Sequence, residues 1–281
     1  MDEIDFYLKD LESRFKLLDS EKYYLSYSGG KDSHFLYWFI KEYLHDSDIQ
    51  IVAVNTYMEH PQIFKRMKKY ADVILIPEMK PFEIKEKYGS SCFSKSQDEF
   101  IRRYQNGSRS KSLLDRIFAR EPSFHNLSKK ARGYLLSGNA HKISPLCCKY
   151  LKKVPFKEYE KRSGRKAIIG VRAKESKLRS AQYKSCFHKN GKFTPIYDLT
   201  DEVLNEIYER YEIEIPKIYD FIERTGCIGC PYGSWKGDTK KELDLLTNDN
   251  RRNFIIEYHK ESYDILGINY NNKQLNLWEE E

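Results

Sequence analysis

The sequence predicts an α/β protein built on a doubly wound parallel sheet. Short runs of apolar, β-forming residues alternate with helical stretches in the first part of the chain and again near residue 167. Two of these runs are apolar throughout, as expected of strands that are buried on both faces. Alternating strands and helices favour a parallel sheet with helices on both of its faces.

Length and composition exclude several classes of protein. The 281 residues suffice for one large domain with a smaller appendage, and 40% apolar with 32% charged residues is typical of soluble globular proteins. Six cysteines are too few for a disulfide scaffold. No apolar run approaches the roughly 18 residues of a membrane span, and the first residues are acidic where a signal peptide is basic. We therefore expect a cytoplasmic protein with no membrane partner.

The first elements follow from periodicity. Apolar residues at alternating spacings of four and three from Ile4 to Leu18 predict an amphipathic packing helix. The β-forming run 23–27, a Gly-Gly turn and a helix over 35–44 come next. Two further strands with a helix between them are predicted over residues 51–54, 61–71 and 73–76.

The rest of the chain gives weaker signals. Residues 82–139 are polar and predict irregular structure with one helical piece at 113–119, whereas 167–171 has the pattern of another central strand. Helices are predicted at 201–208 and within 240–266. We divide the chain into an N-terminal packing helix, an α/β nucleotide-binding domain and a helical, irregular C-terminal part with cysteines, at residues 1–22, 23–200 and 201–281.

The loop after the first predicted strand combines the features of an anion site. It consists of Ser28, Gly29, Gly30, Lys31, Asp32 and Ser33. Ligands of open α/β sheets bind outside the carboxyl ends of the strands, and a helix N-terminus there attracts anions. The glycines permit close approach of the backbone, the lysine supplies charge and the hydroxyls add donors. The alternative is a plain turn followed by a serine-capped helix.

This loop resembles the pyrophosphate loop of the PP-loop superfamily, also called adenine nucleotide alpha hydrolase-like. A P-loop would need Gly at position 25 and Ser or Thr at 32, where this sequence has Leu25 and Asp32. Members of the superfamily hydrolyse ATP between the α and β phosphates or bind adenylyl-sulfate. The resemblance implies that Lys31 and Asp32 are catalytic, with Asp32 as the partner of Mg²⁺.

Further motifs are similar to those of the phosphoadenosine phosphosulfate (PAPS) reductase-like family. These motifs cover roughly residues 23–235 and comprise Asn55-Thr56 with Glu59 and Pro61, Gly170-Val171-Arg172 with Glu175-Ser176 and Arg179, and Pro195 to Asp198 with Asp201. Within the family, the stretch 224–231 looks most like phage and prophage members and DNA-phosphorothioation sulfurtransferases. The resemblance implies that Asn55, Arg172 and Arg179 bind the nucleotide or its sulfate. A capped surface helix is the alternative for the arginine motif.

The cysteines form a Cys-Cys and a Cys-x-x-Cys pair that predict one metal site. Cys147-Cys148 and Cys227-x-x-Cys230 together offer four thiolates, which suit zinc or an iron–sulfur cluster. The first pair, with the basic residues after it, resembles that of the [4Fe-4S] members of the family, and structural zinc is the alternative. Cys186 competes with Cys148 for the place of the fourth ligand. For Cys92 we expect a free thiol without function.

The resemblance and these residues together predict an ATP pyrophosphatase-type sulfurtransferase with a [4Fe-4S] cluster, ATP and Mg²⁺. True sulfonucleotide reductases carry a nucleophilic cysteine in a C-terminal tail, and this sequence has no cysteine after Cys230. The alternatives are an adenylyl-sulfate or PAPS reductase and a non-catalytic nucleotide-sensing or DNA-binding module. The net charge of +7 and local basic clusters favour DNA or tRNA as the acceptor. A sulfur donor or partner subunit is expected as well.

Overall fold

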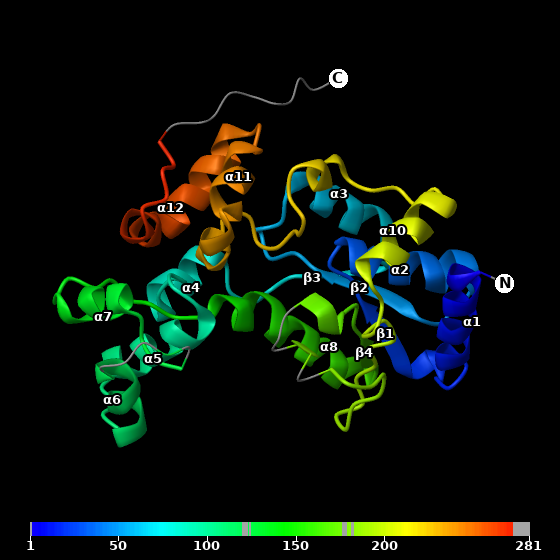
Figure 1. Cartoon of the computed structure of the whole chain (residues 1–281), viewed down its shortest axis with the longest axis horizontal. Coiled ribbons are helices and arrows are strands. Elements are labelled where there is room, and N and C mark those ends of the chain that lie inside the picture. The colour runs from blue at the N-terminus through cyan, green and yellow to red at the C-terminus, as the bar shows by residue number, and fades with distance from the viewer. Residues whose placement is uncertain (1, 120–122, 124, 176–178, 181–182, 272–281) are drawn as a thin grey trace. The chain divides into compact units, whose positions relative to one another are not determined.

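The computed structural model describes residues 2–271 except 120–122, 124, 176–178 and 181–182 (Figure 1). The chain forms two compact units. The first, called the sheet unit, comprises Met1–Asn55, Pro61–Ile76 and Pro155–Tyr219; the second, called the helical unit, comprises Thr56–His60, Pro77–Val154 and Asp220–Glu281. These discontinuous units cut the chain at other places than the division into 1–22, 23–200 and 201–281, which stays a prediction.

The sheet unit is built on a four-stranded, all-parallel sheet with the order β3-β2-β1-β4. Its strands are β1 (Tyr23–Ser26), β2 (Gln50–Val54), β3 (Val73–Leu75) and β4 (Lys166–Ile168). Leu25 in the centre of β1 lies opposite Ile51 on one side and Ile168 on the other. The predicted α/β class with a doubly wound parallel sheet is confirmed.

The strand order determines which face each helix covers. From β1 to β3 the chain moves toward one edge of the sheet, so right-handed crossovers place α2 (Lys31–Trp38) and α3 (Pro61–Tyr70) on one face. The return to β4 reverses the direction and places α8 (Val154–Ser163) on the other face (Figure 1). There, Tyr159 packs edge-on against Tyr24, with 4.9 Å between the ring centroids.

The reversal makes the gap between the ends of β1 and β4 a topological switch point, the place where open α/β sheets bind ligands. The loop 28–33 follows β1, and the segment that begins at residue 169 follows β4. Both segments therefore start next to each other, at the carboxyl ends of two neighbouring strands.

The remaining helices of the sheet unit lie near the predicted positions. They are α1 (Glu3–Phe15), α10 (Asp201–Arg210), the π-helical turn η2 (Phe39–Tyr43) and the short turns η1 (Ser20–Lys22), η4 (Ala173–Glu175) and η5 (Lys217–Asp220). Asp2 caps α1 by accepting a hydrogen bond from Asp5 N at 2.9 Å, and the helix buries Ile4, Leu8, Leu11 and Phe15. Leu18 of the predicted stripe lies beyond the end of this helix.

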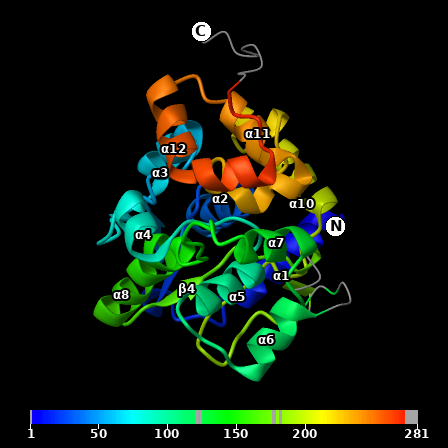
Figure 2. The same cartoon turned by 90° about the vertical axis from the view of Figure 1, so that its left-hand side faces the viewer.

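The helical unit corrects the prediction of irregular structure over 82–139. Figure 2 shows α5 and α6 in front of the view and α11 and α12 above them. The described helices are α4 (Pro81–Tyr88), α5 (Lys95–Gln105), α6 (Lys111–Phe118), α7 (Lys129–Leu136), α11 (Asp238–Asp244), α12 (Asp249–Leu266) and the turns η3 (Lys149–Lys153) and η6 (Pro231–Lys236).

The predicted helical piece at 113–119 is α6, whereas sparse apolar stripes explain why α5 and α7 were not predicted. Each of these helices buries few side chains, among them Ile101, Leu113, Ile117, Ala131 and Leu135, and they meet in one shared core. A helix with so narrow an apolar face is stabilised by packing rather than by its own propensity. In the described part of the chain, no helix is long and apolar enough to cross a membrane.

Candidate nucleotide site and cysteine group

The loop 28–33 has the backbone shape of a phosphate-binding turn. Gly29 has φ +72°, and a Cβ there would lie 2.9 Å from Ile63 Cγ2, so side chains are excluded twice. Gly30 has an ordinary φ of −75° and occupies the N-cap of α2, which begins at Lys31. Of the two glycines in the loop, only Gly29 therefore needs a positive φ. The loop directs a helix N-terminus to the switch point of the sheet.

The two serines hold the loop in this shape. Ser33 Oγ donates to Gly30 O at 3.0 Å and accepts from Ser28 N at 3.2 Å. The two hydroxyl oxygens lie 3.1 Å apart. Both hydroxyls thus preorganise the turn, and reorientation of their protons makes them available as donors to a phosphate.

Two tyrosines clamp the backbone of Lys31. Lys31 N donates to Tyr219 Oη at 3.1 Å, and Tyr208 Oη donates to Lys31 O at 2.7 Å. The ammonium group of Lys31 lies 4.8 Å from the centroid of the Tyr219 ring. Sequence reasoning missed both tyrosines, because nothing in the sequence distinguishes them among the 22 tyrosines of the chain.

Asp32 and Arg172 form an ion pair in which both side chains are mostly buried. Arg172 Nε lies 2.8 Å from Asp32 Oδ1, and Arg172 Nη1 lies 2.6 Å from Asp201 Oδ1. Gly170 permits this approach, since a Cβ there would lie 3.1 Å from the carbonyl carbon of Asp32. The structure thus brings the loop after β1 and the predicted arginine motif together.

Arg179 belongs to the same electrostatic environment. Burial lowers the pKa of its guanidinium, while the charge of Asp32 raises it and that of Arg172 lowers it. Ser176 of the predicted motif lies outside the described residues. Two arginines and one aspartate beside a phosphate-binding loop form a set that suits a polyanion with Mg²⁺.

Asn55 directly follows β2, and its backbone N–H donates to Leu75 O at 2.9 Å. The residues of its motif that follow belong to the helical unit. There Glu59 accepts hydrogen bonds from Thr56 N and from the Thr56 hydroxyl, and its backbone carbonyl accepts one from Arg251. The motif therefore includes a buried carboxylate held by a threonine.

The Cys-x-x-Cys segment of the helical unit is a tight turn inside the core. Gly229 has φ +63°, and a Cβ there would lie 2.4 Å from Tyr263 Oη. Gly229 N donates to Glu242 Oε2 at 2.8 Å, and Tyr263 Oη donates to Gly229 O at 2.5 Å. These contacts fix the backbone between Cys227 and Cys230. Within this turn, Cys230 N donates to Cys227 O at 3.2 Å.

The thiols of Cys147, Cys148, Cys227 and Cys230 are electrostatic neighbours in this unit. The pKa of Cys147 is raised by its hydrogen bond with Cys148 and by burial. The same hydrogen bond and nearby lysines lower the pKa of Cys148 to about 5. Burial raises the pKa values of the other two.

Lys152 is a buried cation beside this group. The negative charge of the Cys227 thiolate raises the pKa of Lys152, and Glu59 and Cys148 act in the same direction. A buried ammonium group favours thiolates over thiols next to it.

The four thiols suit zinc or an iron–sulfur cluster by their chemistry and number. In their present rotamers, however, no three His, Cys, Asp or Glu side chains of the described residues are arranged so as to hold a metal ion.

The other two cysteines have different surroundings. Cys186 belongs to the sheet unit, where its carbonyl accepts from Thr194 N at 2.8 Å and where burial raises the pKa of its thiol. Cys92 is fully buried in the core of α5 to α7, and burial raises its pKa to about 12. All six cysteines belong to the described residues, and none of them is exposed.

Comparisons with known proteins find similarity to solved structures. No protein-family model matches this sequence. No curated protein matches it either. The structure is similar to the crystal structure of phosphoadenylyl-sulfate (PAPS) reductase from Candida auris in complex with phosphate, with a TM-score of 0.44 and 14% identity over 78% of this chain and 92% of that chain.

Proposed function

We propose that the protein is an ATP pyrophosphatase-type sulfurtransferase with a PP-loop. The observation that carries this proposal is the loop 28–33, which follows β1 at the switch point of the sheet with Gly29 at φ +72°. Such a turn in front of a helix N-terminus binds phosphate through backbone N–H groups. An acidic residue and two arginines beside it extend the site to a polyphosphate with Mg²⁺.

Each residue of the loop has a role in the proposed reaction. The loop and Lys31 would hold the phosphates of ATP, and Asp32, which is paired with Arg172 here, would hold Mg²⁺ when the nucleotide binds. Arg172 then turns its guanidinium to the anionic substrate with Arg179. Donors fixed in this way stabilise the negative charge that develops on the phosphates without reorganisation.

The proposed chemistry has two steps, a substitution at the α-phosphorus and a substitution at the acceptor atom. An oxygen of the acceptor attacks this phosphorus, the bond to the bridging oxygen breaks and pyrophosphate leaves with the electron pair. The acceptor now carries AMP on that oxygen. A sulfur nucleophile supplied by a donor then attacks the acceptor atom that bears the activated oxygen, and AMP leaves. The activation converts a poor leaving group into a good one.

We propose that Cys147, Cys148, Cys227 and Cys230 hold a [4Fe-4S] cluster, with Cys186 as the alternative to Cys148. The grouping of the first four in one unit and the buried Lys152 support this choice. When bound, the cluster supplies a place where sulfur is held as sulfide before transfer. Lys152 offsets the negative charge of the thiolates in the low dielectric of the core.

The rival enzyme is an adenylyl-sulfate or PAPS reductase, which needs an accessible thiolate as nucleophile. Two of the six cysteines are buried and four are half-buried, so the products of the reaction must distinguish the two enzymes. The experiment is incubation with ATP, Mg²⁺, a sulfide source and a panel of acceptors, with pyrophosphate and AMP as products. Sulfite release from adenylyl-sulfate in the presence of a thiol reductant would replace the proposal by the reductase. Nucleotide binding without pyrophosphate or sulfite would favour a sensing module.

A further inference from the structure

A basic cavity of about 480 Å³ opens in the helical unit, away from the residues assigned above to the nucleotide site. Four cations, two tyrosines, an asparagine and a leucine line it. These residues are Lys87, Arg102, Lys142, Lys149, Tyr88, Tyr150, Asn106 and Leu146. Among the described residues, no acidic side chain lines the cavity.

A glycine and a short backbone ladder bring the two sides of the cavity together. Gly89 ends α4 with φ +94°, and a Cβ there would lie 2.2 Å from Lys142 O. Directly after it, Ser90 N donates to Lys142 O at 3.0 Å, and Ser144 N donates to Ser90 O at 2.9 Å. Lys87 on α4 and Lys142 are thereby held on one rim.

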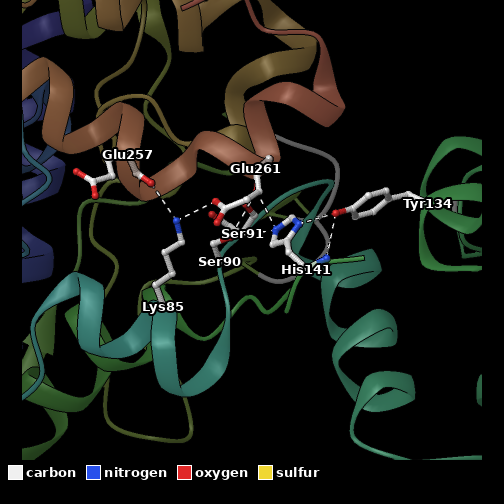
Figure 3. A network of polar contacts seen from close by, with 8 residues as sticks. Lys85, Ser90, Ser91, Tyr134, His141, Glu257 and Glu261 are labelled. Atoms are coloured by element: carbon white, nitrogen blue, oxygen red, sulfur yellow. Dashed lines mark hydrogen bonds and ion pairs between the residues drawn. The ribbon is translucent and has the colours of Figure 1, made fainter. Parts of the chain in front are cut away.

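A polar network fixes the segment that carries Lys142 (Figure 3). His141 Nε2 lies 3.1 Å from Ser90 Oγ, and His141 Nδ1 lies 2.9 Å from Tyr134 Oη. Lys85 on α4 donates to Glu261 Oε2 on α12 at 2.8 Å. The cavity therefore belongs to a braced part of the fold, so its lining charges are preorganised.

The charges of the lining indicate an anionic ligand. Lys87, Lys142 and Lys149 are exposed, and Lys142 Nζ donates to Lys87 O at 2.5 Å. Arg102 is half-buried and bidentate to Glu99, at 2.8 and 2.6 Å. Because Arg102 is already paired with Glu99, the three exposed lysines carry the uncompensated charge of the cavity, and they attract a ligand with more than one negative charge. A chain of phosphates meets this requirement.

The tyrosines add a flat surface beside the cations. The rings of Tyr88 and Tyr150 are stacked, with 4.6 Å between their centroids and 8° between their planes. Lys87 Nζ and Lys149 Nζ lie 5.4 and 5.2 Å from the centroids of these rings. Grooves for single-stranded nucleic acid combine such cations along the backbone with aromatic rings on which bases stack.

We propose that this cavity binds a single-stranded segment of nucleic acid, with its phosphates on the three lysines and a base against the tyrosine pair. Leu146 and Lys149 directly flank Cys147-Cys148 in the sequence, so the bound strand comes close to the cysteine pair. The inference deepens the proposed function by naming the class of acceptor. It rests on the proposed function only in naming the bound strand as the acceptor. Binding of the strand itself is measured without ATP.

The test uses the whole protein and fluorescence anisotropy of labelled single-stranded DNA and RNA about 12 nucleotides long, a length within the range of known single-strand sites. Loss of one phosphate contact should weaken binding about fivefold at about 0.1 M salt and flatten the salt dependence. We expect this of Lys87→Ala and of Lys142→Ala. Lys260→Ala is the matched control, because Lys260 is an exposed lysine on α12 that does not line the cavity.

The outcomes separate the possibilities. Binding of either strand that weakens in both cavity variants and not in the control supports the proposal, and the comparison of DNA with RNA names the strand. Equal affinity in all three variants overturns it, as does tighter binding of a duplex than of the single strand. Competition by AMP as strong as by the strand would make the cavity a mononucleotide site instead. Strand binding that persists without any ATP turnover would contradict the proposed function and leave this inference standing.

Discussion

Arg172 Nε lies 2.8 Å from Asp32 Oδ1, so the arginine after β4 holds the carboxylate at the start of α2. This contact crosses the switch point of the sheet, where Gly170 leaves no room for a side chain against the backbone of Asp32. Without nucleotide, each group neutralises the other. In the proposed function, Asp32 would hold Mg²⁺ and Arg172 would hold a phosphate of ATP, so one pair would provide both halves of the binding site.

The first prediction concerns this pair. Arg172→Ala should weaken the binding of Mg²⁺-ATP by about 1.5–3 kcal/mol, the free energy of a hydrogen bond to a charged group, which is roughly 10- to 150-fold in Kd. Lys31→Ala and Asp32→Ala should also weaken binding with little loss of folding, because both residues lie on the loop at the switch point. Calorimetric titration measures the Kd, and circular dichroism reports the fold.

Arg162→Ala is the matched control for charge, since Arg162 is an exposed arginine of α8 in the same unit. It should bind Mg²⁺-ATP like the parent. If Lys31→Ala and Asp32→Ala also bind like the parent, the interpretation of the loop as a phosphate site is wrong.

The second prediction concerns the loop backbone. Gly29→Ala places a Cβ at φ +72° and 2.9 Å from Ile63 Cγ2, whereas Gly164→Ala places one at φ +73° in open space. Gly164→Ala should cost about 1–2 kcal/mol of unfolding free energy from the left-handed backbone alone. Gly29→Ala should cost more and should also lose ATP binding. Urea unfolding compares the two, and equal losses with intact ATP binding would contradict the crowding at Gly29.

The sequence predicts the sheet of this protein better than its helical unit. Residues 51–54 are apolar throughout because this strand is buried on both faces, whereas the apolar run 73–76 forms a half-buried edge strand with Ile76 exposed. The helices α5 and α7 bury so few side chains that their pattern resembles that of a polar loop, whereas α6 was predicted. Their order comes from a core assembled out of three segments, which no local window contains.

The candidate site, too, could be predicted from the sequence only in part. The loop 28–33 was predictable because its residue types are nearly forced by backbone shape and charge. The clamp on Lys31 was not, since Tyr208 and Tyr219 lie far from the loop in sequence and only the fold brings their hydroxyls to it. The proximity of Lys152 to Cys227 was likewise not predictable, because it depends on packing between η3 and the Cys227 turn.

The third prediction concerns the cysteines. Protein purified without oxygen should be brown and carry about four irons per chain, as four thiolates require. Cys227→Ser, Cys230→Ser and Cys148→Ser should each lose iron and the visible absorbance. Cys186→Ser should keep both, because Cys186 lies in the sheet unit and the other four are electrostatic neighbours in the helical unit.

Cys92→Ser provides the control for a buried thiol outside the group. It should lower the unfolding free energy, because it places a hydroxyl in the core of α5 to α7, and leave the iron content unchanged. Iron retained by Cys148→Ser and lost by Cys186→Ser would exchange their assignments. Colourless protein with one tightly bound zinc would replace the cluster by a structural zinc.

The last prediction concerns the acid stability of the helical unit. His259 on α12 is buried against Tyr258, with 4.6 Å between the ring centroids, and burial lowers its pKa to about 3. In the unfolded chain its pKa is near 6.5, so between these values the unfolded state binds the proton that the folded state refuses. The contribution of His259 to stability is therefore complete above pH 6.5 and falls by about 1.4 kcal/mol per pH unit below it.

His259→Phe keeps a ring of similar size without the proton, so its unfolding free energy relative to the parent should rise at this rate from pH 6 to pH 4. The opposite contribution of Glu242, whose pKa burial raises to about 8, is common to both proteins and cancels in the difference. Urea unfolding monitored by circular dichroism at several pH values measures that difference, and parallel pH profiles would show that His259 titrates in the folded protein as it does in water.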